Sequence, residues 1–134
     1  MTATTIDETA TLRIESAGDG QGVFSIPGTQ YRLHLATEAD LSDRVGQRIR
    51  GRITGHALRM HQASAGGNFI EPLDGRPRIV QGTVLAVDPS SNAVIVDLVV
   101  PFRLSIAEEQ APGMFASGEM VNFYVEPGCR FEAD

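Results

Sequence analysis

Short stretches in which apolar and polar residues alternate set the strongest limit on how this chain can fold. Alternation with a period of two puts one set of side chains on each face of a β-strand, whereas a helix needs apolar residues at intervals of three and four. Pairs such as Pro27-Gly28 and Pro127-Gly128 separate these stretches and favour tight turns. The pattern predicts β-strands at residues 11–15, 23–26, 31–35, 47–53, 56–61, 79–87, 93–100, 102–107 and 120–125.

One segment between these strands predicts a short helix. The side-chain oxygen of Thr37 can accept a hydrogen bond from a free amide at a helix start, and Asp40 can return one. Gly46 ends this helix, so it covers at most residues 37–45. The predicted fold class is therefore all-β, a small Greek-key barrel with one short helix.

Two parts of the chain share a pattern. Residues 31–36 (YRLHLA) match residues 102–107 (FRLSIA), and Gly46-Gln47 matches Gly118-Glu119. One interpretation is two pseudo-repeated halves, at about 11–54 and 83–126, with a connector at 55–82. The alternative is that small barrels share turn spacing by necessity. In both cases residues 10–134 are predicted to form a single domain, after a disordered N-terminal tail at residues 1–9.

The strand order resembles the OB-fold, a five-stranded Greek-key barrel, because three strands, a short helix and a fourth strand follow one another. Residues 82–98 (GTVLAVDPSSNAVIVDL), followed by FRLSIA and SGEMVNFYVEPG, are also similar in layout to TOBE and molbindin-type modules. That resemblance implies an OB-like barrel and, as one function, binding of small oxyanions. The oxyanion-binding Ser-Arg-Asn signature of molbindins is absent from this sequence, so their ligand is not implied.

The 134 residues are enough to bury a core without a metal or disulfide. Cys129 is the single cysteine, which excludes an intrachain disulfide and favours a reducing compartment, so we expect a cytoplasmic protein. The N-terminus lacks the basic and apolar regions of a signal peptide, and no apolar run approaches the roughly 18 residues of a membrane span. We expect no membrane partner.

The distribution of charge points to one basic region in an acidic chain. The formal net charge is −6, and all eleven basic residues are arginines. Residues 44–78 contain seven of these arginines and only two acids, Glu71 and Asp74. Three arginines, Arg48, Arg50 and Arg52, alternate with Ile49, Gly51 and Ile53, so they are predicted to share one strand face.

This arginine face is the leading candidate site. Guanidinium groups roughly 7 Å apart along a strand can pair with successive phosphates of single-stranded nucleic acid. The alternative is a solvated face whose arginines pair with acids on neighbouring strands. The predicted nucleic-acid or anion-binding residues are Arg48, Arg50, Arg52, Arg59, Arg76 and Arg78.

A second candidate site lies in the connector, where His56, His61, Asn68 and Glu71 surround the glycine pair of Ala65-Gly66-Gly67-Asn68. These residues could form a binding loop, or the segment could simply connect the two halves. Their spacing does not match a metal motif, and neither a GxSxG elbow nor a P-loop occurs. The sequence therefore predicts no metal, no cofactor and no catalytic residue.

These observations favour a non-catalytic domain that binds a polyanion such as single-stranded nucleic acid. Two alternatives remain open at this point. One is a protein-interaction or homo-oligomerisation module, for which the apolar second half and any free strand edge are the relevant features. The other is a small-oxyanion binder.

Overall fold

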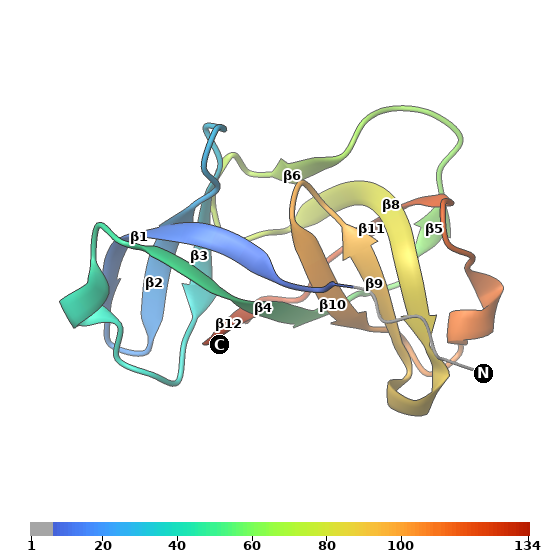
Figure 1. Cartoon of the computed structure of the whole chain (residues 1–134). Helices are drawn as coiled ribbons and strands as arrows, with labels where there is room; N and C mark the ends of the chain where they lie inside the picture. The colour runs from blue at the N-terminus through green and yellow to red at the C-terminus, as the bar shows by residue number, and fades with distance from the viewer. Residues whose placement is uncertain (1–6) are drawn as a thin grey trace.

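The computed structural model describes residues 7–134, so residues 1–6 of the predicted tail lie outside the described part of the chain. The described chain contains twelve strands and three 3-10 turns, joined by loops (Figure 1). The strands are β1 (Ala10–Gly18), β2 (Gln21–Ser25), β3 (Arg32–Ala36), β4 (Arg48–His56), β5 (His61–Gln62), β6 (Phe69–Glu71), β7 (Asp74–Gly75), β8 (Ile79–Asp88), β9 (Ala93–Asp97), β10 (Pro101–Ser105), β11 (Met120–Tyr124) and β12 (Arg130–Ala133). The turns are η1 (Ser42–Arg44), η2 (Pro89–Ser91) and η3 (Pro112–Met114).

Five strands close a barrel in the first half of the molecule. Strand β1 pairs with β2, β2 with β3, β3 with β12, β12 with β4, and β4 returns to β1. The β3–β12 pair is parallel and the other four are antiparallel. The predicted all-β small barrel is confirmed.

The second half repeats the plan of the first. Strands β8, β9 and β10 are antiparallel neighbours, and β11 pairs with β8 as β4 pairs with β1. Both leading hairpins carry a bulge, between Ile14 and Ser16 in one and between Val84 and Ala86 in the other. Gly46 and Gly118 both take positive φ, 89° and 92°, just before β4 and β11. The two halves therefore share their strand plan as well as the sequence pattern.

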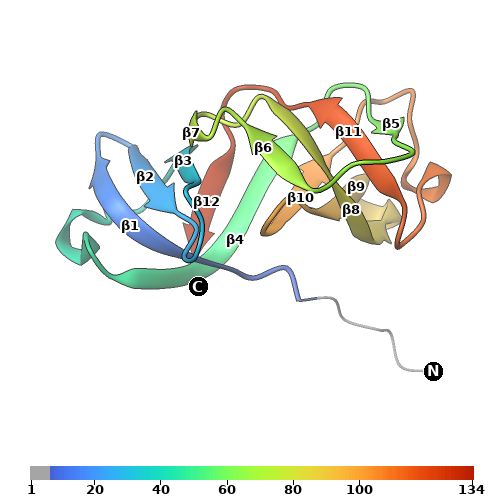
Figure 2. The ribbon, with the colours of Figure 1, turned by 90° about the horizontal axis from the view of Figure 1, so that it is seen from above.

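Each half is completed by a strand from the other half. Strand β12 follows the second half along the chain but lies between β3 and β4 of the first barrel. In return, the end of β4 runs parallel to β10, and the chain continues to a bridge between Ala57 and Val125 beside β11. Figure 2 shows β4 passing from one half of the molecule to the other. Because of this exchange, neither half holds its full complement of strands alone.

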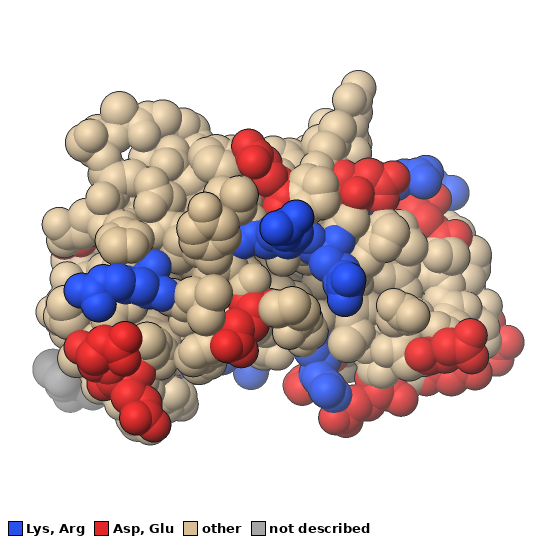
Figure 3. Space-filling model, turned by 180° about the vertical axis from the view of Figure 1, so that it is seen from behind, with Lys and Arg blue, Asp and Glu red and all other residues tan. Residues whose placement is uncertain are grey.

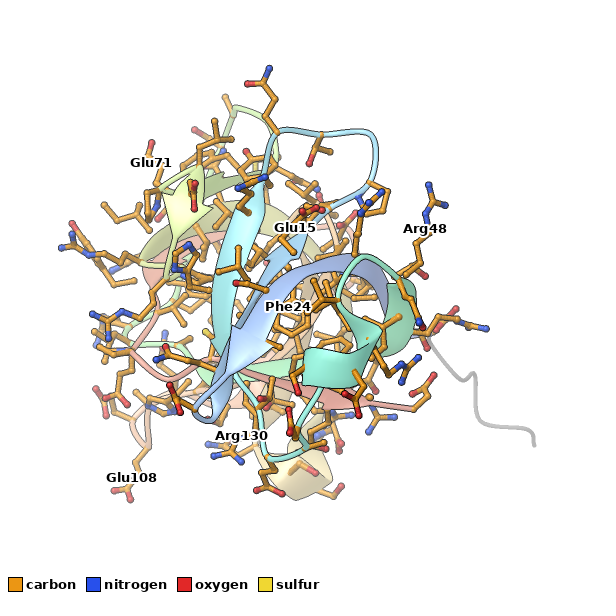
Figure 4. All side chains as sticks on the ribbon, turned by 90° about the vertical axis from the view of Figure 1, so that its left-hand side faces the viewer. Glu15, Phe24, Arg48, Glu71, Glu108 and Arg130 are labelled. Atoms are coloured by element: carbon orange, nitrogen blue, oxygen red, sulfur yellow. The ribbon has the colours of Figure 1, made fainter. Side chains whose placement is uncertain are left out.

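Side chains from the N-terminal and C-terminal parts of the chain pack together inside the first barrel. Phe24 of β2 and Phe131 of β12 are buried, with ring centroids 4.9 Å apart. Figure 4 looks along this half and places Phe24 inside it. A Cβ atom at Gly51 would collide with the carbonyl oxygen of Glu132 and the Phe131 ring, so glycine lets β4 and β12 approach closely. The exchanged strand is thus part of the core.

The helical segment is shorter than predicted, being the single 3-10 turn η1. Leu41, and not Thr37, precedes this turn, and no side chain caps it. The Thr37 amide, to which Asp40 was expected to return a bond, donates to the carbonyl of Gly20. Asp40 accepts a hydrogen bond from the amide of Ser42, which favours a turn over a helix start. Within residues 7–134, no helix has the length and apolar character needed to cross a membrane.

Two predicted strands also differ from the strands in the structure. The strand predicted at 93–100 stops at Asp97, because the Asp97 carboxylate accepts the amide of Val99, which turns with φ 96°. The strand predicted at 56–61 is interrupted, since β4 ends at His56 and β5 begins only at His61. In both places a local turn or a change of partner strand overrides β-propensity.

Candidate nucleic-acid interface

The arginines of β4 stand on the outer face of the first barrel. Arg48, Arg50 and Arg52 are exposed, whereas Ile49, Gly51 and Ile53 between them are buried. Figure 4 shows Arg48 pointing away from the interior that contains Phe24. A rise of about 3.3 Å per residue separates successive arginines by roughly 6.6 Å. The strand alternation thus produces the regular row of guanidinium groups that the sequence predicts.

Acids balance only part of this row. The nearest guanidinium and carboxylate atoms of Arg52 and Glu8 are 4.0 Å apart, and Glu132 of β12 lies opposite Arg52. Arg13 of β1 lies opposite Arg48 and forms a 3.7 Å ion pair with Glu15. No ion pair within residues 7–134 involves Arg48 or Arg50. Arg48 and Arg50 are therefore not neutralised by an ion pair in this part of the chain, although hydrogen bonds from Thr9 and then the charge of Arg50 lower the pKa of the Asp7 carboxyl.

The outer face of β4 continues beyond Arg52 into a hollow between the two halves, which we call the waist hollow. Its volume is about 500 Å³, and Thr54 and His56 of β4 form part of its wall. Arg103 of β10 and Arg130 of β12 lie opposite Thr54 on the two neighbouring strands and also line it. The row of outward residues on β4 therefore leads to two more arginines.

His56 and Ser105 meet in the waist hollow. Their Nδ1 and Oγ atoms are 2.6 Å apart, because the parallel register of β4 and β10 sets the two residues opposite each other. Ser105 Oγ is also 3.4 Å from the carbonyl oxygen of Gly55. Both side chains lie at the wall of an open hollow, where a hydroxyl and an imidazole can bind a polar ligand.

Arg103 is the best-anchored cation of the site. Its Nε and Nη2 atoms donate to the two carboxylate oxygens of Glu8 at 2.7 and 2.9 Å, and its Nη1 atom donates to Asp88 at 2.9 Å. These hydrogen bonds lower the pKa of the Glu8 carboxyl and raise the pKa of Arg103. The pKa of Asp88 also falls, because Ser90 and then Arg103 donate to it. Arg103 is therefore held rigidly and largely neutralised.

The structure divides the predicted arginines into two groups. Arg76 and Arg78 line a separate hollow of about 390 Å³ beside Tyr124, which we call the tyrosine hollow. Arg59 follows Leu58, another residue of its wall, but no arginine of β4 lines it. Figure 3 shows basic residues near the middle of the back of the molecule, with acidic residues around them.

The four predicted loop residues take part in different contacts. His56 belongs to the waist hollow, and His61 is exposed on β5 opposite Asn122. The Asn68 side chain accepts a hydrogen bond from Thr83, and Glu71 is exposed on β6. Within residues 7–134 no group of histidine, cysteine and acidic side chains could hold a metal ion.

A buried glutamine that the sequence interpretation missed holds the glycine loop. Gln81 Nε2 donates to the carbonyls of Ala65 and Gly67, and a Cβ atom at Gly66 would meet the same nitrogen. A polar residue within the apolar pattern of residues 79–87 was the available signal. These contacts fix the loop to β8.

In the C-terminal segment, burial raises the pKa of the Cys129 thiol to about 11, so the neutral thiol predominates at neutral pH.

Arg103 and Arg130, which join the candidate interface, were also not predicted as site residues. Arg103 is 95 residues from Glu8 along the chain, and nothing in the local sequence pairs them. The strand pairings alone place both arginines beside Thr54.

Comparison with protein-family models, with curated proteins and with solved structures finds no match for this chain.

Proposed function

We propose that the protein binds single-stranded nucleic acid along the outer face of β4. The observation that carries the proposal is the regular row of Arg48, Arg50 and Arg52, two of which have no ion pair within the described chain. Their spacing of roughly 6.6 Å is close to the distance between successive phosphates of an extended strand. The phosphodiester backbone is the ligand that such a row fits best.

The length of the outer β4 face supports a short binding site. From Arg48 to His56, the end of β4, the chain advances eight positions, which corresponds to roughly 26 Å of extended strand. That length accommodates about four nucleotides, at the lower end of the range of roughly 4–16 that small barrels of this kind bind. Thr54 and His56 offer hydrogen bonds at the end of this face, beyond the arginine row.

The acidic remainder of the molecule favours a confined binding site. With a net charge of −6, most of the surface repels a polyanion, and affinity then depends on the few exposed arginines. A cytoplasmic location is part of the proposal, since the single cysteine needs no oxidising compartment.

Single arginine variants test this proposal. Each guanidinium that contacts a phosphate of a single strand contributes about −0.7 to the slope of log K against log salt. We expect Arg48→Ala and Arg50→Ala each to make the slope for a mixed-sequence oligonucleotide shallower by about this amount. Arg44→Ala is the control, because Arg44 is an exposed arginine on η1 and is not part of the β4 row.

Equal slopes for all three variants would show that net charge, not the β4 row, governs binding. Self-association that tolerates salt, with no oligonucleotide binding, would favour an interaction module instead. The closed barrel leaves only the short strands β5, β6 and β7 at the margins of the described sheet, which gives such a module little edge to extend.

A second candidate function is binding of a small oxyanion in the waist hollow. Arg103, Arg130, His56 and Ser105 line a space of about 500 Å³ there, with Arg103 paired to Glu8 and Asp88 and Arg130 paired to Glu38. Stabilisation by phosphate or molybdate, absent in Ser105→Ala and without preference for polymers, would favour this function over nucleic-acid binding. The leading proposal predicts the reverse, with Ser105→Ala nearly neutral for a long oligonucleotide.

A further inference from the structure

The tyrosine hollow combines an exposed aromatic ring with unpaired cations. Tyr124 at the end of β11 is 59% exposed, and Leu58, which forms another part of the wall, is 43% exposed. Large side chains this exposed on a barrel leave apolar surface in contact with water. Arg76 and Arg78 complete the wall and take part in no ion pair within the described residues.

Hydrogen bonds fix the backbone on both sides of Tyr124. Its carbonyl accepts the amide of Leu58, and the residue pairs with Ile79 across β8. The next residue, Val125, is buried and donates its amide to the carbonyl of Arg78. The phenol hydroxyl makes no hydrogen bond within residues 7–134. The exposed ring therefore extends from an ordered backbone, with its face and hydroxyl open to a planar ligand.

Pro77 fixes the relative position of the two arginines. It is buried, its ring restricts its own φ, and it favours an extended conformation at Arg76. Arg76 lies at a bend, and both arginines are exposed on either side of the buried proline. Arg76 and Arg78 therefore present two guanidinium groups at the rim of an aromatic surface.

We propose that the tyrosine hollow binds one unpaired nucleobase of the single strand, stacked on Tyr124, with Arg76 and Arg78 on the adjacent phosphates. The inference rests on the proposed function and names the chemistry of a second subsite. A stacked base fits both features of the hollow, because a base has a planar apolar face and its phosphates carry the complementary charge. An acidic peptide offers the charge but seldom a planar group beside it.

The tyrosine hollow is joined to the arginine row by the chain itself. Leu58 is exposed at a bend two residues after His56, where β4 ends. Pro127 lines both the waist hollow and the tyrosine hollow. A strand that leaves the β4 arginines and crosses the waist hollow reaches Tyr124 next. In this arrangement the β4 arginines bind phosphates and Tyr124 binds a base.

Intrinsic fluorescence tests stacking directly, because the chain has two tyrosines and no tryptophan. The variant Tyr31→Phe leaves Tyr124 as the single fluorophore and removes only a 3.4 Å hydrogen bond to the Ile70 amide. We expect an oligothymidylate to quench this fluorescence as it binds. The sugar–phosphate polymer of the same length without bases is expected to bind more weakly and to leave the fluorescence unchanged.

Affinity measurements on position 124 give the second test. Tyr124→Ala is expected to weaken oligothymidylate binding roughly 5- to 150-fold, the range for one stacked base. Tyr124→Phe keeps the ring and is expected to stay within about twofold of the parent. Met114→Ala is the matched control, since Met114 is 55% exposed but lies outside the tyrosine hollow. Circular dichroism and thermal melting establish that each variant is folded.

The outcomes separate this inference from the proposed function. Binding that depends on Arg48 and Arg50 but not on Tyr124, with unchanged tyrosine fluorescence, refutes the base subsite and leaves the β4 proposal standing. Equal losses for the oligothymidylate and the base-free polymer in Tyr124→Ala also refute stacking. If no oligonucleotide binds the parent protein, both proposals fail together.

Discussion

Removing the Phe131 ring tests whether the last strand of the chain completes the first barrel. Phe131 is 2% exposed and packs on Phe24 with ring centroids 4.9 Å apart, so Phe131→Ala leaves a cavity that the rigid barrel cannot fill. Substitutions of this kind cost about 3–5 kcal/mol, a large share of the roughly 5–15 kcal/mol that stabilises a domain. With an unfolding entropy of about 2.1 cal/mol/K per residue, the melting temperature should fall by about 10–18 °C.

Urea denaturation followed by the fluorescence of each tyrosine is the assay. Tyr31 precedes β3 in the first half and Tyr124 ends β11 in the second, so Tyr31→Phe and Tyr124→Phe backgrounds report the halves separately. Because the halves exchange strands, we expect Phe131→Ala to lower both midpoints equally.

Glu132→Ala is the control for Phe131→Ala. Glu132 is exposed on the same strand, and its substitution should change the free energy of unfolding by no more than about 0.5 kcal/mol. A loss below about 1 kcal/mol in Phe131→Ala, or a shift confined to the Tyr31 midpoint, would refute the reasoning.

Two further changes probe the close approach of strands and the buried ion pair. Gly51→Ala should destabilise the protein by about 1–3 kcal/mol in thermal melts, because its methyl group collides with the Phe131 ring and the Glu132 carbonyl. Arg103→Gln should lower stability at neutral pH, and the difference from the parent should shrink below about pH 4 in urea titrations. The depressed pKa of Glu8 stabilises the fold above its unfolded pKa, and this contribution disappears as the carboxylate is protonated.

Matched substitutions sharpen both tests. Gly67→Ala adds the same methyl group where no atom lies within 4 Å, so a loss equal to that of Gly51→Ala would contradict the packing argument. Arg44→Gln removes an exposed arginine without an ion pair within residues 7–134, and its effect should not vary with pH. A constant difference between Arg103→Gln and the parent from neutral pH to pH 3 would mean that Glu8 does not contribute.

Much of the fold could be predicted from local pattern, because the period of two and the turn residues act over a few positions. The hairpins at the start of each half and the outward row on β4 follow from that pattern. The exchange of strands did not follow, since the contact between Phe24 and Phe131 joins segments more than 100 residues apart. The capping pattern at Thr37 misled because the Gly20 carbonyl, distant in sequence, takes its amide.

The candidate site shows the same division between local and distant information. Strand alternation places Arg48, Arg50 and Arg52 on one face without reference to the rest of the chain. Arg103 enters the site only through β10, whereas the alternation of β11 turns Tyr124 outward between the buried Phe123 and Val125. The sequence joined Arg76 and Arg78 to the β4 row, whereas the structure places them around a separate hollow.

The most direct test of nucleic-acid binding is the anisotropy of a labelled single-stranded oligonucleotide, titrated with the protein at roughly 50 and 200 mM salt. Three phosphate contacts on β4 predict an affinity roughly 20-fold weaker at the higher salt. The triple variant Arg48→Ala, Arg50→Ala, Arg52→Ala should lose most of this dependence together with most of the affinity. Failure of the parent protein to bind at either salt, or unchanged binding by the triple variant, would contradict the proposal.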